Sequence, residues 1–159
     1  MVYSESYQRT RDIDWFFQEG NRSIHVASNG GELPYLANDI ERLRTIQAQV
    51  SILEDIKGVD IIVNEQYVGE RTAEATNNYW QNGYENVTRE QVRDFYLSSF
   101  IAMARKGFYS YDRVPDSNAY MFICGPKTPV AVDLEVPQTD AQIIFLEKDK
   151  SLFLVEHYF

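Results

Sequence analysis

The best-marked element of this 159-residue chain is residues 87–107, which read VTREQVRDFYLSSFIAMARKG. Thr88 and Gln91 have the spacing of a capping box, in which two side chains and two backbone N–H groups satisfy one another at a helix start. The stretch from 95 to 104 is apolar except for two serines. The sequence therefore predicts a helix over 88–106 that lies inside a core or turns one face toward a partner.

Strand-like segments on both sides of this helix indicate an α+β fold. Residues 13–18 and 23–28 are β-prone and flank a turn-like Gly-Asn pair, which predicts a hairpin. A second helix is expected over 38–54, where Asn38 can cap and apolar residues recur every three or four positions. Further strands are expected at 59–63, 108–111, 119–124, 130–136, 142–147 and 152–155. Strands that mostly follow one another favour a largely antiparallel sheet with both helices on one face, in a single domain.

Residues 65–86 carry no clear periodicity and are expected to form an irregular, polar, acidic insert. Connections of this length often carry function, and Tyr and Trp dominate the hot spots of protein interfaces. The alternative is that the aromatic side chains pin a long loop to the body of the domain. Under the first interpretation the partner-binding residues are Tyr79, Trp80 and Tyr84, with Glu70, Glu74 and Glu85 around them.

The charge of the chain argues against two classes of partner. It has 24 acidic and 15 basic residues, a net charge of −9. Non-specific nucleic-acid binding requires clustered Lys and Arg, and so does binding to anionic membrane surfaces; neither pattern occurs. No apolar run approaches the ~20 residues of a membrane span. The N-terminal residues lack a signal-like apolar region, and a lone cysteine suits a reducing compartment, so we expect a cytoplasmic protein.

Reactive side chains are few. The two histidines, 25 and 157, and the single cysteine have no metal-ligand spacing, so no metal or cofactor is predicted. A Gly-rich loop after a strand can bind a ligand through its backbone N–H groups, and a cysteine near an imidazole can act as a nucleophile. These features support a second interpretation, a small-molecule-binding protein or enzyme whose pocket contains His25, Ser28, Asn29, Gly30, Gly31 and Cys124.

Three functional hypotheses follow. The favoured one is a small, acidic, cytoplasmic interaction protein with a protein partner, in the manner of an immunity or antitoxin-like factor. A basic partner would suit it, because complementary charge accelerates encounter and disfavours wrong partners. The pocket hypothesis is second, and an enzyme is less favoured because no complete catalytic constellation is visible. A homo-oligomer that buries the reverse side of helix 88–106 is the third.

Overall fold

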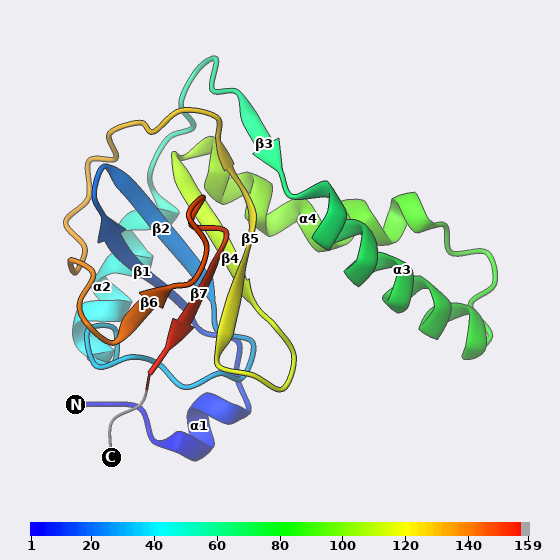
Figure 1. The fold of residues 1–159 in the computed structure, drawn as a ribbon, viewed down its shortest axis with the longest axis horizontal. Coiled ribbons are helices and arrows are strands. Elements are labelled where there is room, and N and C mark those ends of the chain that lie inside the picture. The colour runs from blue at the N-terminus through cyan, green and yellow to red at the C-terminus, as the bar shows by residue number, and fades with distance from the viewer. Residues whose placement is uncertain (157–159) are drawn as a thin grey trace.

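In a computed structural model, which describes residues 1–156, the chain forms one curled sheet with helices outside it (Figure 1). The strands are β1 (Asp14–Glu19), β2 (Arg22–Ala27), β3 (Ile61–Val63), β4 (Phe108–Arg113), β5 (Ala119–Pro126), β6 (Ile143–Phe145) and β7 (Leu152–Val155). Their order is β1-β2-β4-β5-β7-β6, and β3 pairs with β5 beside β7. Every pair between these strands is antiparallel except β2–β4, which is parallel. The predicted α+β fold with a mostly antiparallel sheet is confirmed.

Both predicted helices are present. The helices are α1 (Glu5–Arg9), α2 (Ile40–Ser51), α3 (Glu65–Gln81) and α4 (Arg89–Arg105). The capping box of Thr88 and Gln91 forms at the start of α4. At the start of α2 the cap is Asp39, which accepts from the Arg42 backbone N–H at 3.2 Å, whereas Asn38 accepts from the Tyr3 N–H at 2.8 Å. None of these helices, within the described residues, has the length and apolar character to cross a bilayer.

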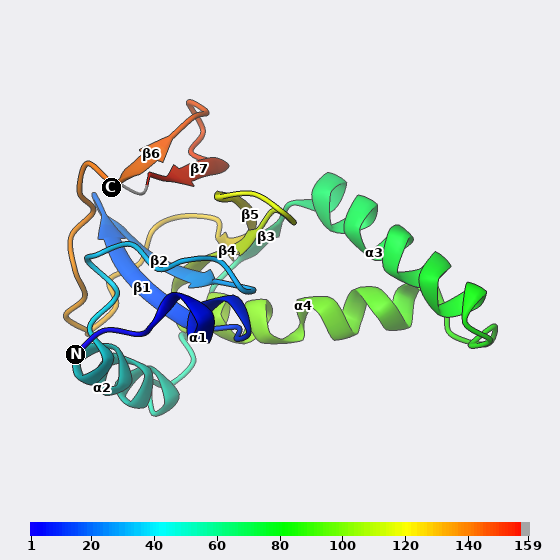
Figure 2. The same ribbon diagram turned by 90° about the horizontal axis from the view of Figure 1, so that it is seen from below.

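One face of the sheet is covered by α2 and α4, as Figure 2 shows. Phe16 of β1 lies opposite His25 of β2, so their side chains share this face. Phe16 borders the same small cavity as Leu43 and Ile46 of α2. The His25 ring lies 6.2 Å from the ring of Phe100 of α4. The expectation that both helices pack on one face is therefore confirmed.

The opposite face is closed by the sheet itself. The β6–β7 hairpin curls over β1, β2 and β4, on the side away from the helices (Figure 2). Phe153 of β7 is fully buried, and its ring centre lies 5.0 Å from Tyr111, 5.1 Å from Tyr120 and 6.3 Å from Trp15. The free edge of β1 is covered as well, because Gln18 exchanges two 2.8 Å backbone hydrogen bonds with residues 137–139. The sheet thus encloses an aromatic core.

The strand expected at 130–136 does not form. The segment 127–137 leaves β5 and crosses outside the sheet to reach the edge of β1. Prolines on both sides of it lack the N–H that a strand ladder needs. The alternating valines contact a glycine instead: Cγ2 atoms of Val130 and Val132 lie 2.8 and 2.9 Å from the position that a Cβ of Gly107 would take. The strand at 61–63 does form, but its Ile62 is 43% exposed, so the strand is less buried than expected.

The expectation that residues 65–86 are irregular is wrong, because α3 occupies most of them. The buried residues of α3 are Val68, Thr72 and Thr76, spaced four apart on one face. Each threonine hydroxyl donates to the carbonyl four residues earlier, at 2.7 and 2.6 Å. These internal bonds let polar residues occupy a buried helix face, which hides the helix from a search for apolar periodicity. Helices α3 and α4 form an antiparallel hairpin, the α3–α4 arm, that projects from the sheet (Figure 1).

The aromatic core gives the first prediction. Phe153→Ala should lower the free energy of unfolding by about 3–5 kcal/mol, because a large ring is removed from a closed core. The matched control is Phe95→Ala on the arm, where the ring is 82% exposed, and we expect a change within about 0.5 kcal/mol. Urea titration followed by circular dichroism measures both. Equal losses in the two variants would contradict the assignment of Phe153 as the centre of the core.

Candidate functional site

The three aromatic residues singled out from the sequence meet at the tip of the α3–α4 arm. The rings of Tyr79 and Tyr84 make an edge contact at 6.0 Å. Trp80 Nε1 donates to the carbonyl of Val87 at 2.7 Å, and the Arg89 guanidinium lies 5.8 Å from the Trp80 ring centre. The rings therefore brace the turn of the arm itself, and the alternative in which they pin a loop to the domain body is wrong.

The tip is open to solvent although it is braced. Tyr79, Trp80 and Tyr84 are 42%, 38% and 61% exposed. Tyr79 and Tyr84 line an apolar groove of about 420 Å³. Its other lining residues are Ala75, Asn78 and Asn82. The arrangement can receive an apolar side chain or insert its own rings into a pocket.

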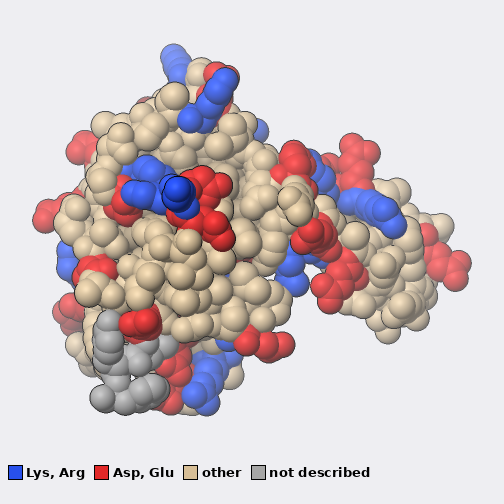
Figure 3. Space-filling view, viewed as in Figure 1, with Lys and Arg blue, Asp and Glu red and all other residues tan. Residues whose placement is uncertain are grey.

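The acidic residues singled out with these rings are spread along the arm. Glu85 lies in the turn, whereas Glu70 and Glu74 lie on α3. Residues 65–105 contain six acidic residues and four arginines, a net charge of −2. Arg93 pairs with Glu65 at 2.7 Å, and Figure 3 shows red and blue side chains interleaved along the arm. The surface of the arm is therefore less acidic than residues 65–86 suggested.

Helix α4 is not buried all round. Val92, Leu97, Phe100 and Ala104 form its buried face. On the opposite face Phe95 is 82% exposed, and it is followed by exposed small residues at 98, 99 and 102. The apolar run that predicted a buried helix thus includes one ring that faces solvent.

His25 lies under α4, in a hydrogen-bonded array that is buried at Ser110 and reaches solvent at the half-exposed Asp14 side chain. It is 2% exposed; Nε2 lies 2.9 Å from Asp14 Oδ1 and Nδ1 lies 2.8 Å from Ser110 Oγ. Both ring nitrogens of His25 therefore have a hydrogen-bond partner. Ser110 is fully buried, whereas a nucleophilic hydroxyl must reach its substrate. We therefore assign this array to tying β1, β2 and β4 together; His157 lies outside the described residues.

Cys124 lies beside this array and not at the Gly-rich loop. It pairs with Ser110 across β4 and β5 and is fully buried. Burial raises the pKa of the Cys124 thiol to about 12, so the thiolate that acts as nucleophile or metal ligand is disfavoured. No group of three or more His, Cys, Asp or Glu side chains within residues 1–156 could hold a metal ion.

The Gly-rich loop does border a groove, of about 640 Å³, between the loop and the β4–β5 turn. Of the expected pocket residues, Gly30 and Gly31 line it. Ser28 is buried and accepts from the Ile13 N–H at 2.7 Å, while the Asn29 N–H donates to Asp12 at 2.9 Å. The groove is lined by Arg9, Gly30, Gly31, Glu32, Arg113, Asp116, Ser117, Asn118 and Tyr120. His25 and Cys124 are absent from it, so the expected pocket is divided between two places.

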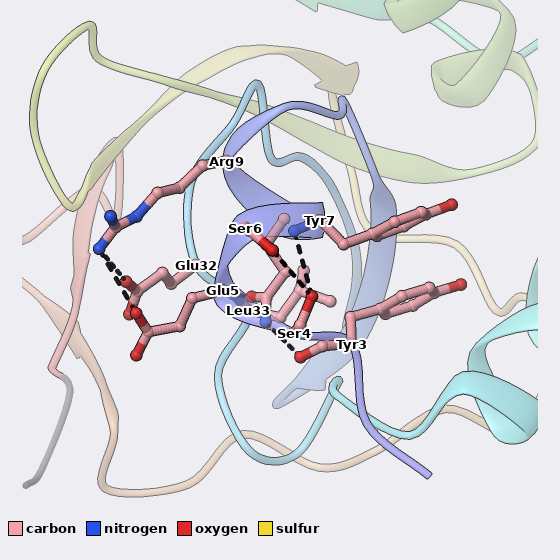
Figure 4. Close-up of polar contacts among 9 residues, drawn as sticks. Tyr3, Ser4, Glu5, Ser6, Tyr7, Arg9, Glu32 and Leu33 are labelled. Atoms are coloured by element: carbon pink, nitrogen blue, oxygen red, sulfur yellow. Dashed lines mark hydrogen bonds and ion pairs between the residues drawn. The ribbon is translucent and has the colours of Figure 1, made fainter.

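Sequence reasoning missed the arginines and the tyrosine of this groove. They come from three segments that the fold brings together: the end of α1, the end of β4 and the start of β5. The Arg9 guanidinium pairs with Glu32 at 3.4 Å and with Glu5 at 3.6 Å (Figure 4). The one local signal for this groove in the sequence was the Gly30-Gly31 pair that follows β2. Position 31 requires glycine because a Cβ there would overlap the hydroxyl of Tyr120.

A buried polar cluster joins the arm to the sheet. Asp112 of β4 is 4% exposed and accepts from the Tyr96 hydroxyl of α4 at 2.7 Å. Burial raises the pKa of Asp112, and burial together with the nearby Asp112 carboxylate raises that of Tyr96. Tyr67 Oη and Arg71 Nε of α3 are buried with no hydrogen-bond partner among the described residues. The cluster links α3, α4 and β4 at the root of the arm.

No protein-family model, curated protein or solved structure matches this chain.

The buried carboxyl of Asp112 gives the second prediction. Its raised pKa means that the folded chain binds this proton more tightly than the unfolded chain, so protonation stabilises the fold at low pH and this contribution is lost as pH rises. Asp112→Asn removes that dependence. The melting temperature of the variant minus that of the wild type should rise between about pH 4, the ordinary Asp range, and pH 7. A pH-independent difference between the two melting temperatures would contradict this assignment.

The Gly-rich loop gives the third prediction. A methyl group at Gly31 would overlap the Tyr120 hydroxyl and crowd the Ser28 carbonyl. Gly31→Ala should destabilise the fold by about 1–3 kcal/mol, the usual effect of overpacking. Tyr120→Phe removes the overlapping oxygen, so the double variant should recover part of that loss in a double-mutant cycle. Strictly additive effects of the two substitutions would show that they do not meet.

Proposed function

We propose that this chain is a binding protein that docks another protein with the tip of the α3–α4 arm. One observation carries the proposal: every residue from 77 to 86 is exposed, at the end of a hairpin that projects from the sheet (Figure 2). This tip holds three aromatic side chains and an apolar groove. Large aromatic side chains that are held in place but not buried are typical of interface hot spots.

The arm is longer than the sheet requires. Phe100 and Ala104, in the second half of α4, share a buried cluster with Ile123 and Cys124 of β5. Helix α4 also packs against α3, and Val92 in its distal half is buried. A 17-residue helix is about 25 Å long. Ordering backbone costs about 1–2 kcal/mol per residue, and the exposed tip recovers little of this by burial.

The chemistry of the tip indicates the kind of partner. Tyr79 and Tyr84 suit a partner with an apolar pocket of the size of an aromatic ring. Glu85 and Glu90 lie in and just beyond the turn, so a basic rim on that pocket would complement them. The net charge of −9 adds long-range attraction to such a partner. A cytoplasmic, immunity- or antitoxin-like factor is one form of this proposal.

Photo-crosslinking tests the proposal. A photoreactive phenylalanine analogue replaces Tyr84, which is 61% exposed at the tip, or Ile52, which is 80% exposed at the end of α2 and serves as the control. In the native cell, position 84 should give a product of defined mass that position 52 does not give. Mass spectrometry then identifies the captured chain.

The fourth prediction also concerns affinity, which is measured between this chain and the captured protein after purification. Tyr84→Ala should raise the dissociation constant at least tenfold, as expected for a hot-spot ring. The circular dichroism spectrum of the variant should stay unchanged. Ile52→Ala should bind like the wild type. The same crosslinks from both positions, or unaltered binding by Tyr84→Ala, would refute docking at the tip. A product with the mass of two copies would support the homo-oligomer instead.

A further inference from the structure

We propose that the groove between the Asn29–Glu32 loop and the β4–β5 turn binds a small carboxylic acid, anchored by Arg113 and Tyr120. This site is distinct from the arm, and it stands or falls independently of the function proposed above. The volume of about 640 Å³ is within the range of ~300–1,000 Å³ that small-molecule sites occupy.

Tyr120 supplies the first anchor. Its side chain is 1% exposed and lines the groove. Its hydroxyl makes none of the hydrogen bonds found within residues 1–156, yet it is not one of the fully buried polar atoms that lack a partner, so this oxygen reaches the groove. A phenolic hydroxyl at the wall of a groove can donate a hydrogen bond to a ligand that offers an acceptor. Burial raises the pKa of Tyr120, so the phenol keeps its proton and can donate it. A Cβ on Gly31 would overlap this oxygen, so only a glycine backbone can pack this close to it.

Arg113 supplies the second anchor. Its Nε donates to the Ser117 carbonyl at 2.7 Å and its Nη1 donates to the Asn29 carbonyl at 3.2 Å. A guanidinium has five N–H groups, so three remain. None of the ion pairs among the described residues includes Arg113, in contrast to Arg9 on the other side of the groove, which is paired with Glu5 and Glu32 (Figure 4). The two carbonyls thus fix the orientation of the planar Arg113 guanidinium, whose charge is not neutralised by an ion pair within the described residues. Its remaining N–H groups match the geometry of a carboxylate.

The remaining charges narrow the ligand class. Glu32 and Asp116 line the same groove, and they would repel a phosphate ester or a polycarboxylate. Glu32 is already paired with Arg9, so in a ligand with one carboxylate and a neighbouring ammonium group the ammonium would face Asp116. Free α-amino acids have this chemistry. A peptide that ends in the groove offers the carboxylate without the adjacent ammonium, so the two sources can be separated.

Titration of the ¹⁵N-labelled protein, observed by NMR, tests this fifth prediction. The probes are a panel of α-amino acids, their amides, short peptides with free C-termini, and inorganic phosphate. Free amino acids or peptides should shift the amide signals of Gly30, Gly31 and Ser117 in a saturable manner. The matched amides, which lack the carboxylate, should not. Stronger shifts by free amino acids than by peptides identify the source as the zwitterion, and the reverse identifies a peptide terminus.

Two variants and one control separate binding from folding. Tyr120→Phe keeps the buried ring and removes one hydrogen bond, so it should weaken binding about 3- to 10-fold. Arg113→Gln removes the fork and should weaken it at least tenfold, while Arg42→Gln on α2 should change nothing. Unaltered affinity of the folded Tyr120→Phe variant, equal binding of the amides or of phosphate, or absence of saturable shifts at tens of millimolar would each overturn the proposal.

Discussion

The structure depends on the contact of Phe153 with the inner face of its own sheet. A single sheet of this size leaves one face exposed unless a second layer covers it. Here the helices cover one face, and the β6–β7 hairpin curls back to cover the other with Phe153 against Trp15, Tyr111 and Tyr120. The backbone bonds of Gln18 to residues 137–139 close the remaining edge. Because this closure uses aromatic rings, the body of the domain accounts for many of the aromatic residues in the composition.

The sequence predicted correctly those elements whose formation depends on residues close together in the chain. The hairpin of β1 and β2, the capping box of α4 and the sequential strands after it all depend on neighbours within a few residues. The helix α3 escaped prediction because threonines occupy its buried face at Thr72 and Thr76. The segment 130–136 was mistaken for a strand because its valines alternate, although a glycine on another element is what they contact.

Long-range register explains why the site residues were harder to predict. His25 meets Ser110 because β2 pairs in parallel with β4, across 85 residues of sequence. His25 is separated from the Gly-rich loop groove because the alternation of side chains along β2 turns its imidazole toward α4. Arg113 and Tyr120 reach that groove from either side of the β4–β5 turn. A periodic pattern reveals which face a residue occupies, but it does not reveal which distant strand lies beside it.

The parallel pairing of β2 with β4 also determines where the arm leaves the body. All residues between these two strands belong to one long crossover, and α3 and the distal half of α4 form a detour within it (Figure 1). The detour departs just after β3 and returns along α4 to β4. Whole helical turns could therefore be added to or removed from both legs together without altering strand pairing. The length of the arm is therefore structurally independent of the curled sheet that carries it.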